Sequence, residues 1–196
     1  MGFSQGCTVI SSMALYHAFD QRHTKGNDGE GNGNGFPFPA AIFICGGIPL
    51  YALKDMGLPV SHEAEDLNRA TAALLSGTAG HLTTLAANTK LIKRGVGLWD
   101  GNVSKGSLLH DPLVRPRRED VFGLDFSSFP DWARIDIPTV HVYGGKDPRW
   151  PGGIQLAELC TESKRSEIDH GGGHDIPRLS GVSVRIAELI QELLPI

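Results

Sequence analysis

The chain has 196 residues, of which 40% are hydrophobic, and a formal net charge of -4. This length suits one domain with its own core, and the charge offers no basic surface for nucleic acid. Three widely spaced cysteines, Cys7, Cys45 and Cys160, match neither a disulfide framework nor a metal-ligand spacing, which favours a reducing compartment. No apolar stretch has membrane-spanning length and no signal-peptide pattern is present, so we expect a soluble, cytoplasmic protein with no membrane partner.

The first six residues carry the most informative motif. Gly2-Phe3-Ser4-Gln5-Gly6 has the Gly-x-Ser-x-Gly form of a nucleophile elbow, a sharp strand-to-helix turn that exposes a serine hydroxyl. We expect both glycines to be required, because a side chain at either would collide with the neighbouring strand or helix. The backbone N–H of Gln5 would then donate to an oxyanion. The alternative is a helix start with Ser4 as a solvated cap, and only Met1 is available for the strand that an elbow needs before it.

The next two elements are a helix and a buried strand. Apolar residues recur at near-helical spacing from residue 5 to about 23, which predicts one helix packed on a sheet. The glycine-rich run 25–35 predicts a flexible surface loop rather than a phosphate-binding loop, since no Lys-Ser/Thr pair follows it. Residues 40–47 form an apolar run closed by glycines, which is typical of a strand buried on both faces of a parallel sheet.

The pattern changes between residues 59 and 133. Helical segments at 63–75 and 82–91 precede a loop rich in Gly, Pro and Arg, and we expect a lid or substrate-pocket region over the active-site face. A plain crossover helix is the alternative for the first segment. Three arginines of the loop could face an acidic carrier or substrate, although an exposed charged loop is the commoner explanation. They are Arg115, Arg117 and Arg118.

The last third of the chain alternates strands and helices. Residues 135–145 and 164–168 predict strands, and helical spacing follows them at about 152–160 and 182–194. Strands joined by such crossovers run parallel, so their carboxyl ends share one side of the sheet. We therefore predict an α/β fold, with a parallel sheet flanked by helices, in a single domain over residues 1–196.

Ligands of a parallel sheet lie beyond the carboxyl ends of its strands, and this rule separates the candidate acids and bases. Asp147 follows the strand at 135–145, whereas Asp136 precedes that strand and belongs at the opposite edge. His174 follows the next strand after three glycines, which let the imidazole reach Ser4. An imidazole can take the proton of a serine hydroxyl, and a carboxylate fixes the tautomer of that imidazole. The sequence therefore predicts a catalytic triad of Ser4, Asp147 and His174, in the chain order of α/β-hydrolases.

Other residues near His174 remain as alternatives. His170 could be the base, but it abuts the strand, where a structural histidine is more usual. A metal pair of His170 and His174 would lack both a helical face and a third ligand. Asp175 is too close in sequence to His174 to orient it easily, and His141 is most simply a packed sheet residue.

Three segments of the chain resemble the family of serine hydrolases (FSH) esterases and thioesterases: 2–6, 144–147 and 170–178. Within that family the chain is most similar to the fungal lovastatin-type thioesterases that release polyketides from synthases. The resemblance covers the chain end to end and is loosest between residues 59 and 133. It implies charge-relay roles for Ser4, Asp147 and His174, and hydrolysis through an acyl-serine intermediate with no metal or organic cofactor.

The resemblance also implies a class of substrate, and it implies that family members are longer than this chain. The substrate would be an acyl chain on the acyl carrier domain of a polyketide synthase, in secondary metabolite biosynthesis, or a small acyl ester. Family members carry roughly a hundred residues before the elbow, including central strands and the loop of the second oxyanion donor. We therefore expect a partial α/β-hydrolase fold that lacks the N-terminal strands. Three hypotheses follow: a thioesterase or esterase, a catalytically impaired remnant or interaction module, and a small-molecule carboxylesterase.

Overall fold

The computed structural model of the protein describes residues 1–24, 36–88, 98–100 and 116–193. In that part of the chain, four strands form one parallel sheet whose spatial order equals the chain order. The strands are β1 (Gly2–Phe3), β2 (Ala41–Ile44), β3 (Thr139–Tyr143) and β4 (Arg165–Asp169). Because all four run in the same direction, their carboxyl ends lie on one side of the sheet.

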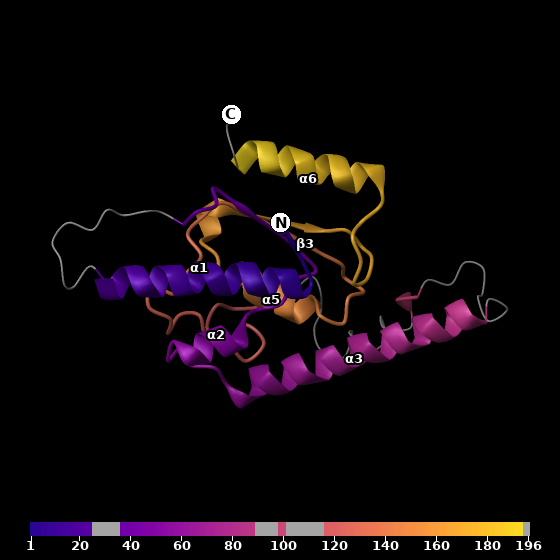
Figure 1. Ribbon diagram of the computed structural model, residues 1–196, viewed down its shortest axis with the longest axis horizontal. Helices are drawn as coiled ribbons and strands as arrows, with labels where there is room; N and C mark the ends of the chain where they lie inside the picture. Colours follow the sequence, from indigo (N-terminus) through magenta and orange to yellow (C-terminus); the bar gives the residue numbers. More distant parts are fainter. Residues whose placement is uncertain (25–35, 89–97, 101–115, 194–196) are drawn as a thin grey trace.

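Helices pack on both faces of this sheet (Figure 1). One face is covered by α6 (Ser180–Leu193), and the other by α1 (Gln5–Thr24) and α5 (Trp150–Glu158). On the side of α1, the short helix α2 (Leu50–Asp55) and the long helix α3 (His62–Ala87) lie further from the sheet. A 3₁₀ turn, η3 (Glu162–Lys164), leads into β4. The predicted fold class, a parallel sheet flanked by helices, is confirmed.

The middle of the sheet is buried on both faces. Alternate residues of β2 point in opposite directions, into the cores on the two sides of the sheet. Ala41 and Phe43 belong to the core on the side of α1 and α5. Ile42 and Ile44 belong to the smaller core under α6, where they lie with Leu189. The apolar run at 40–47 therefore forms a strand covered on both sides, as its sequence predicted.

The strand before Ser4 is formed by the first two residues of the motif itself, which corrects the expectation that only Met1 was available for it. Gly2 and Phe3 form a two-residue strand that pairs with Phe43 and Ile44 of β2. The N–H of Ser4 extends this pairing by donating to the Ile44 carbonyl at 3.0 Å. Two residues anchor the serine because the parallel neighbour supplies their hydrogen-bond partners.

A single helix replaces the two segments expected at 63–75 and 82–91. α3 runs without a break through Gly77 and Gly80, where a glycine costs only about 1 kcal/mol relative to alanine. Its start is fixed by Ser61, whose hydroxyl oxygen accepts from the Ala64 N–H at 3.0 Å. The lid or pocket role expected for 59–133 stays a prediction, and part of that region lies outside the described residues.

The other expected elements lie close to their predicted bounds. The helix predicted at 5–23 is α1, and those predicted at 152–160 and 182–194 are α5 and α6. The glycine-rich run 25–35 lies outside the described residues. Among the helices that are described, none combines the length and the apolar character needed to cross a bilayer.

Candidate active site

Ser4 lies at the sharp turn between β1 and α1. Its φ of 53° is in the left-handed region, which a non-glycine residue adopts at an energetic cost. Gly2 is required for this turn, since a Cβ there would lie 2.7 Å from the carbonyl carbon of Gly6 and 2.8 Å from the nitrogen of Cys7. At Gly6 a Cβ would meet no described atom within 4 Å. The expectation that a side chain at Gly6 would collide with a neighbour is therefore wrong for the described residues.

Ser4, His174 and Asp147 lie in one hydrogen-bonded row. Nε2 of His174 is 2.9 Å from Oγ of Ser4, and Nδ1 of His174 is 2.8 Å from Oδ2 of Asp147. A carboxylate can only accept, so Nδ1 carries the proton and Nε2 is left to accept from the serine hydroxyl. This is the tautomer in which an imidazole can remove the serine proton.

The carboxylate of Asp147 is held on both oxygens. The side chain is 1% exposed, and its Oδ1 accepts from the backbone N–H of Arg149 at 2.7 Å. The guanidinium of Arg149 in turn donates to Asn68 and Thr71 of α3, at distances of 2.7 to 3.0 Å. Burial lowers the pKa of Arg149, while the nearby charge of Asp147 acts in the opposite direction. The acid of the row is thus fixed by a loop that is itself bonded to α3.

The loop that carries His174 is packed tightly against the loop after β3. The N–H of Lys146 donates to the Gly172 carbonyl at 2.9 Å. Oδ1 of Asp169 accepts from the N–H of Gly145 at 2.9 Å and from that of Gly171 at 2.7 Å. These bonds join the ends of β3 and β4, so the two loops hold Asp147 and His174 in fixed relation.

Two aromatic residues flank the imidazole and its loop. The ring of Phe3 lies 5.3 Å from that of His174, and a Cβ on Gly173 would fall inside the indole of Trp99. Lys146 forms an ion pair of 2.7 Å with Asp100, the residue after Trp99. The described part of the predicted lid region therefore contacts the loops that carry Asp147 and His174, and the lid role stays a prediction.

Gln5, the predicted oxyanion donor, is the first residue of α1. The first N–H groups of a helix have no acceptor within the helix, and the positive end of the helix dipole lies at the same place. The position of Gln5 next to Ser4 therefore suits donation to an oxygen that becomes negative during reaction.

The alternative residues have structural partners instead. Nε2 of His170 is 3.8 Å from the sulfur of Cys45, and Nδ1 is 4.0 Å from the carboxylate of Asp175, so neither nitrogen contacts Ser4. Asp136 lies at the opposite edge of the sheet, bonded to Lys164 at 2.8 Å. His141 is 2% exposed, and burial lowers its pKa to about 3.

The arginine cluster of the loop is only partly described. Arg117 is exposed and Arg118 is half-buried. Nη2 of Arg118 is buried and has no hydrogen-bond partner among the described residues. Arg115 lies outside the described residues, so the expectation of an acidic partner for the three remains a prediction.

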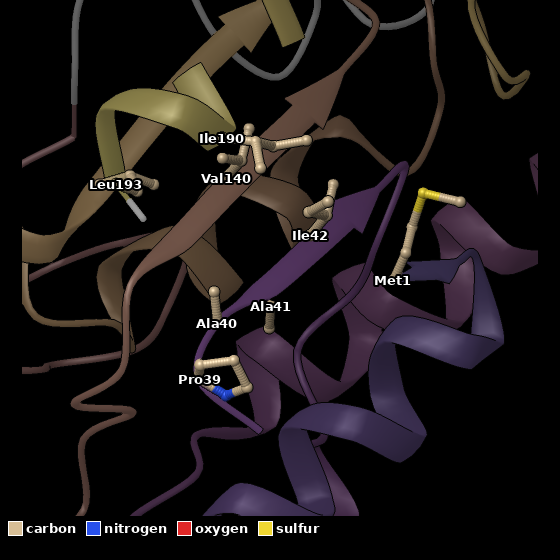
Figure 2. Close-up of a pocket in the computed structure, with 8 residues that line it drawn as sticks. All are labelled: Met1, Pro39, Ala40, Ala41, Ile42, Val140, Ile190 and Leu193. Atoms are coloured by element: carbon tan, nitrogen blue, oxygen red, sulfur yellow. The ribbon is translucent and has the colours of Figure 1, made fainter. Parts of the chain in front are cut away.

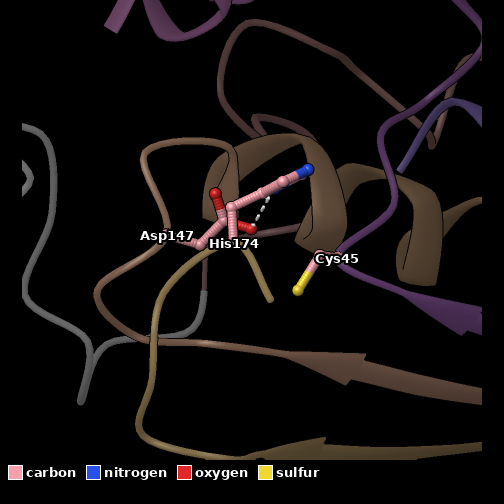
Figure 3. Close-up of side chains that lie close together, drawn as sticks. All are labelled: Cys45, Asp147 and His174. Atoms are coloured by element: carbon pink, nitrogen blue, oxygen red, sulfur yellow. Dashed lines mark hydrogen bonds and ion pairs between the residues drawn. The ribbon is translucent and has the colours of Figure 1, made fainter. Parts of the chain in front are cut away.

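Cys45 is a neighbour of this site that sequence reasoning missed. Figure 3 shows its side chain, at the end of β2, beside Asp147 and His174. One ligand atom from each of the three residues lies within 4.8 Å of the others. Cys45 is the first residue after β2, and Asp147 also follows its strand. The rule that ligands lie beyond the carboxyl ends of the strands could therefore have identified Cys45 as well.

The three residues of this cluster suit a hydrogen-bond network better than a metal ion. Nδ1 of His174 and Oδ2 of Asp147 already bond each other, and a metal would have to break that bond. Burial, followed by the charge of Asp147, raises the pKa of the Cys45 thiol well above its usual range. A protonated thiol is a poor metal ligand.

Two hollows differ in their relation to the triad. An apolar pocket of about 120 Å³ lies between α6 and the first residues of β2 and β3, and its lining includes Ile42, Val140 and Ile190 (Figure 2). No triad residue lines it, because it opens toward the strand starts. A second hollow of about 430 Å³ is bordered by Arg149 and by Thr8, one turn along α1 from Ser4.

A parallel sheet with a serine, a histidine and an aspartate hydrogen-bonded at its carboxyl edge is the arrangement of an α/β-type serine hydrolase. The chain matches the family described as serine hydrolase (FSH1) over residues 1–186 and belongs to that family. The family resemblance found in the three motifs is thereby confirmed.

Three relatives named as esterases or hydrolases match the chain over different lengths. Esterase FPY3 of Fusarium mangiferae is 44% identical over 45 residues, which cover 23% of this chain and 21% of that protein. Esterase FUS5 of Gibberella fujikuroi is 42% identical over 62 residues, covering 31% and 27%. Hydrolase FUB4 of Gibberella moniliformis is 27% identical over 198 residues, covering 97% of this chain and 64% of that protein.

The chain matches less than two thirds of the length of each of these three relatives. No solved structure gives a significant match to the chain.

Proposed function

We propose that the protein hydrolyses acyl thioesters or esters through a covalent intermediate on Ser4. The observation that supports this most directly is the row of hydrogen bonds from Oγ of Ser4 through His174 to Asp147. Membership of a serine hydrolase family supports the same reaction class. In this proposal the residues of the row are catalytic, and no cofactor takes part.

The proposed reaction has two halves. Oγ of Ser4 attacks the acyl carbonyl carbon while Nε2 of His174 takes its proton, and the carboxylate of Asp147 stabilises the imidazolium. The N–H of Gln5 donates to the oxyanion. The leaving thiol or alcohol then receives the proton from Nε2 and departs. Water repeats the sequence on the acyl-serine, which releases the acid and restores the hydroxyl.

For the substrate, we propose an acyl chain delivered by the carrier domain of a polyketide synthase. The resemblance of the three motifs to polyketide-releasing thioesterases supports this choice. The similarity to proteins named as esterases supports ester cleavage in general. The hollow bordered by Thr8 and Arg149 is a candidate place for the acyl chain. A small acyl ester is the alternative substrate.

The first experiment asks whether Ser4 reacts. The protein is incubated with a fluorophosphonate probe, and intact mass with peptide mapping locates the adduct. We expect one adduct on Ser4, none on Ser4→Ala, and none on heat-denatured protein, because only the folded triad activates the hydroxyl. A folded protein that stays unlabelled would contradict the proposal and favour a non-catalytic interaction module.

The second experiment separates the substrates. Hydrolysis rates are compared for an acylated carrier domain, the same acyl chain on a small thiol, and the matching oxoester. A higher kcat/KM for the carrier-bound chain supports the carrier proposal, whereas equal or higher rates for the small esters support a carboxylesterase.

A further inference from the structure

The residue that calls for an explanation is Cys45. It has a φ of 48°, in the left-handed region, although glycine is the residue that adopts this conformation at low cost. Its backbone is fixed, since its N–H donates to the Val142 carbonyl at 2.8 Å, and the residue is 2% exposed. A strained backbone position held by its surroundings directs the side chain to one place.

The side chain of Cys45 contacts the loop that carries His174. The sulfur of Cys45 is 3.6 Å from the carbonyl oxygen of Gly173 and 3.4 Å from that of Asp175. These two carbonyls stand on either side of His174 in the chain. The sulfur is also within 4.8 Å of the ligand atoms of His174 and Asp147.

Most other backbone bonds of this loop lie in its first half, and one, from the Asp175 N–H to the Gly173 carbonyl at 3.0 Å, spans His174. Gly171 is bonded to Asp169, and Gly172 accepts from Lys146. Three successive glycines follow His170 and restrict the backbone little. The thiol of Cys45 contacts the two residues that flank His174, where a displacement would move the imidazole away from Ser4.

We propose that Cys45 is a positioning residue for the base. Its S–H donates to the carbonyls of Gly173 and Asp175 and so keeps the His174 imidazole in line between Ser4 and Asp147. The effect of Cys45 on catalysis rests on the proposed function. The hydrogen bond between His174 and Asp147, which Cys45 maintains in this proposal, can be measured without turnover. The role requires a neutral thiol, and the raised pKa of Cys45 meets that requirement, because a thiolate would face two carbonyl oxygens and the Asp147 carboxylate.

The test compares Cys45→Ala and Cys45→Ser with Cys160→Ala. Cys160 is a matched control, since it is 1% exposed and its thiol also donates to a backbone carbonyl, that of Leu156, at 3.4 Å. It lies beyond α5, away from the triad loops. Both alanine variants lose a buried thiol, so a general loss of stability would appear in both.

Two measurements are made on each folded variant. The first is the low-field proton NMR signal of Nδ1 of His174, assigned by its loss in His174→Gln, which reports the bond to Asp147. The second is the rate of fluorophosphonate labelling across pH. We expect Cys45→Ala to broaden or shift the signal and to slow labelling by about ten- to a hundredfold, as misplaced catalytic groups do. Cys45→Ser, which keeps a donor, should restore both, and Cys160→Ala should change neither.

The outcomes separate this inference from the proposed function. A Cys45→Ala variant with an unchanged signal and an unchanged labelling rate overturns the positioning role. A wild-type protein without any low-field signal overturns it as well. If the wild type shows the signal, Cys45→Ala loses it and neither is labelled, then the positioning role holds and the proposed hydrolysis fails.

Discussion

An aspartate, a histidine and a cysteine occur in both halves of the parallel sheet, and the two sets behave differently. Toward the carboxyl ends of the strands, Asp147 bonds His174, and Cys45 contacts the loop that carries His174. The second set lies near the start and in the body of β3, and no member of it bonds another member. It consists of Asp136, His141 and Cys160.

The partners of the second set are structural. Asp136 accepts from Lys164 and from the Thr161 hydroxyl, both at 2.8 Å, and these bonds lower its pKa. Nε2 of His141 is 3.1 Å from the hydroxyl of Thr139, which lies two residues earlier in the same strand. Burial raises the pKa of Cys160 to about 12.

The comparison shows that residue type alone does not make a reactive site. In the second set the aspartate and the histidine are bonded to different neighbours and not to each other. In the first, the imidazole bonds a carboxylate on one nitrogen and a hydroxyl on the other, and that hydroxyl stands at the end of the row. Parallel topology contributes to the difference, because the carboxyl ends of the strands are where ligands of a parallel sheet lie.

The largest expected difference comes from the two aspartates. Asp147→Asn should lower the labelling rate and kcat/KM by about ten thousandfold, because an amide favours the wrong tautomer of the imidazole. Asp136→Asn, in the same type of change, should stay within about twofold, since it removes only an exposed ion pair. Rates are measured with the probe and with the best acyl substrate. Equal losses in both variants would contradict the distinction between the two edges.

A smaller effect is expected from the contact between the loops that carry Asp147 and His174. A Cβ on Gly144 would lie 2.2 Å from the Gly172 carbonyl oxygen and 2.7 Å from that of Gly173. Gly144→Ala must therefore push the His174 loop away, and we expect a loss of about 3 kcal/mol in unfolding free energy together with slower labelling. Urea unfolding and probe kinetics measure the two effects.

The control for that change is Gly153→Ala in α5. A Cβ there would make only ordinary contacts, 3.5 Å from the Gly46 carbonyl oxygen and 3.7 Å from Cβ of Tyr143. Because alanine has the higher helix propensity, this variant should be neutral or slightly more stable. A stable, fully reactive Gly144→Ala variant would show that the loops are less tightly joined than their geometry indicates.

Much of this fold follows from patterns that one sequence carries. The apolar run of β2 and the helical spacing of α1, α5 and α6 identify their elements, because burial on both faces and on one face leave different periodicities. The positions of Asp147 and His174 after their strands led to the expected row of side chains. These are local signals combined with one topological rule.

Other features depend on contacts that no local pattern encodes. The two-residue strand before Ser4 exists because β2 lies beside it, and α3 continues through two glycines that propensity treats as breaks. The absence of a described neighbour at Gly6 and the contact of Cys45 with the His174 loop are properties of the assembled structure. Tertiary packing decides the first strand and the contact of Cys45, whereas α3 continues through glycines that have no tertiary neighbour among the described residues.

The smallest expected effect concerns the pH dependence of stability and the histidine of the second set. Burial, with a lesser contribution from the charge of Arg165, lowers the pKa of His141 from 6.5 to about 3. Between these values the unfolded chain binds a proton that the folded chain does not, so stability falls as pH decreases from 6.5 toward 3, by up to about 1.4 kcal/mol per pH unit. Above pH 6.5 this contribution no longer changes.

His141→Gln removes that proton uptake from the unfolded state without adding a charge. We expect the wild type to lose about 2 kcal/mol more than the variant between pH 8 and pH 5, measured by urea unfolding at both values. His81→Gln, at an exposed position of α3, should follow the wild type. Parallel curves for His141→Gln and the wild type would mean that His141 takes up a proton inside the folded sheet. The second set would then contain a charged, solvated site of its own, and the contrast between the two sets would have to rest on Asp136 and Cys160 alone.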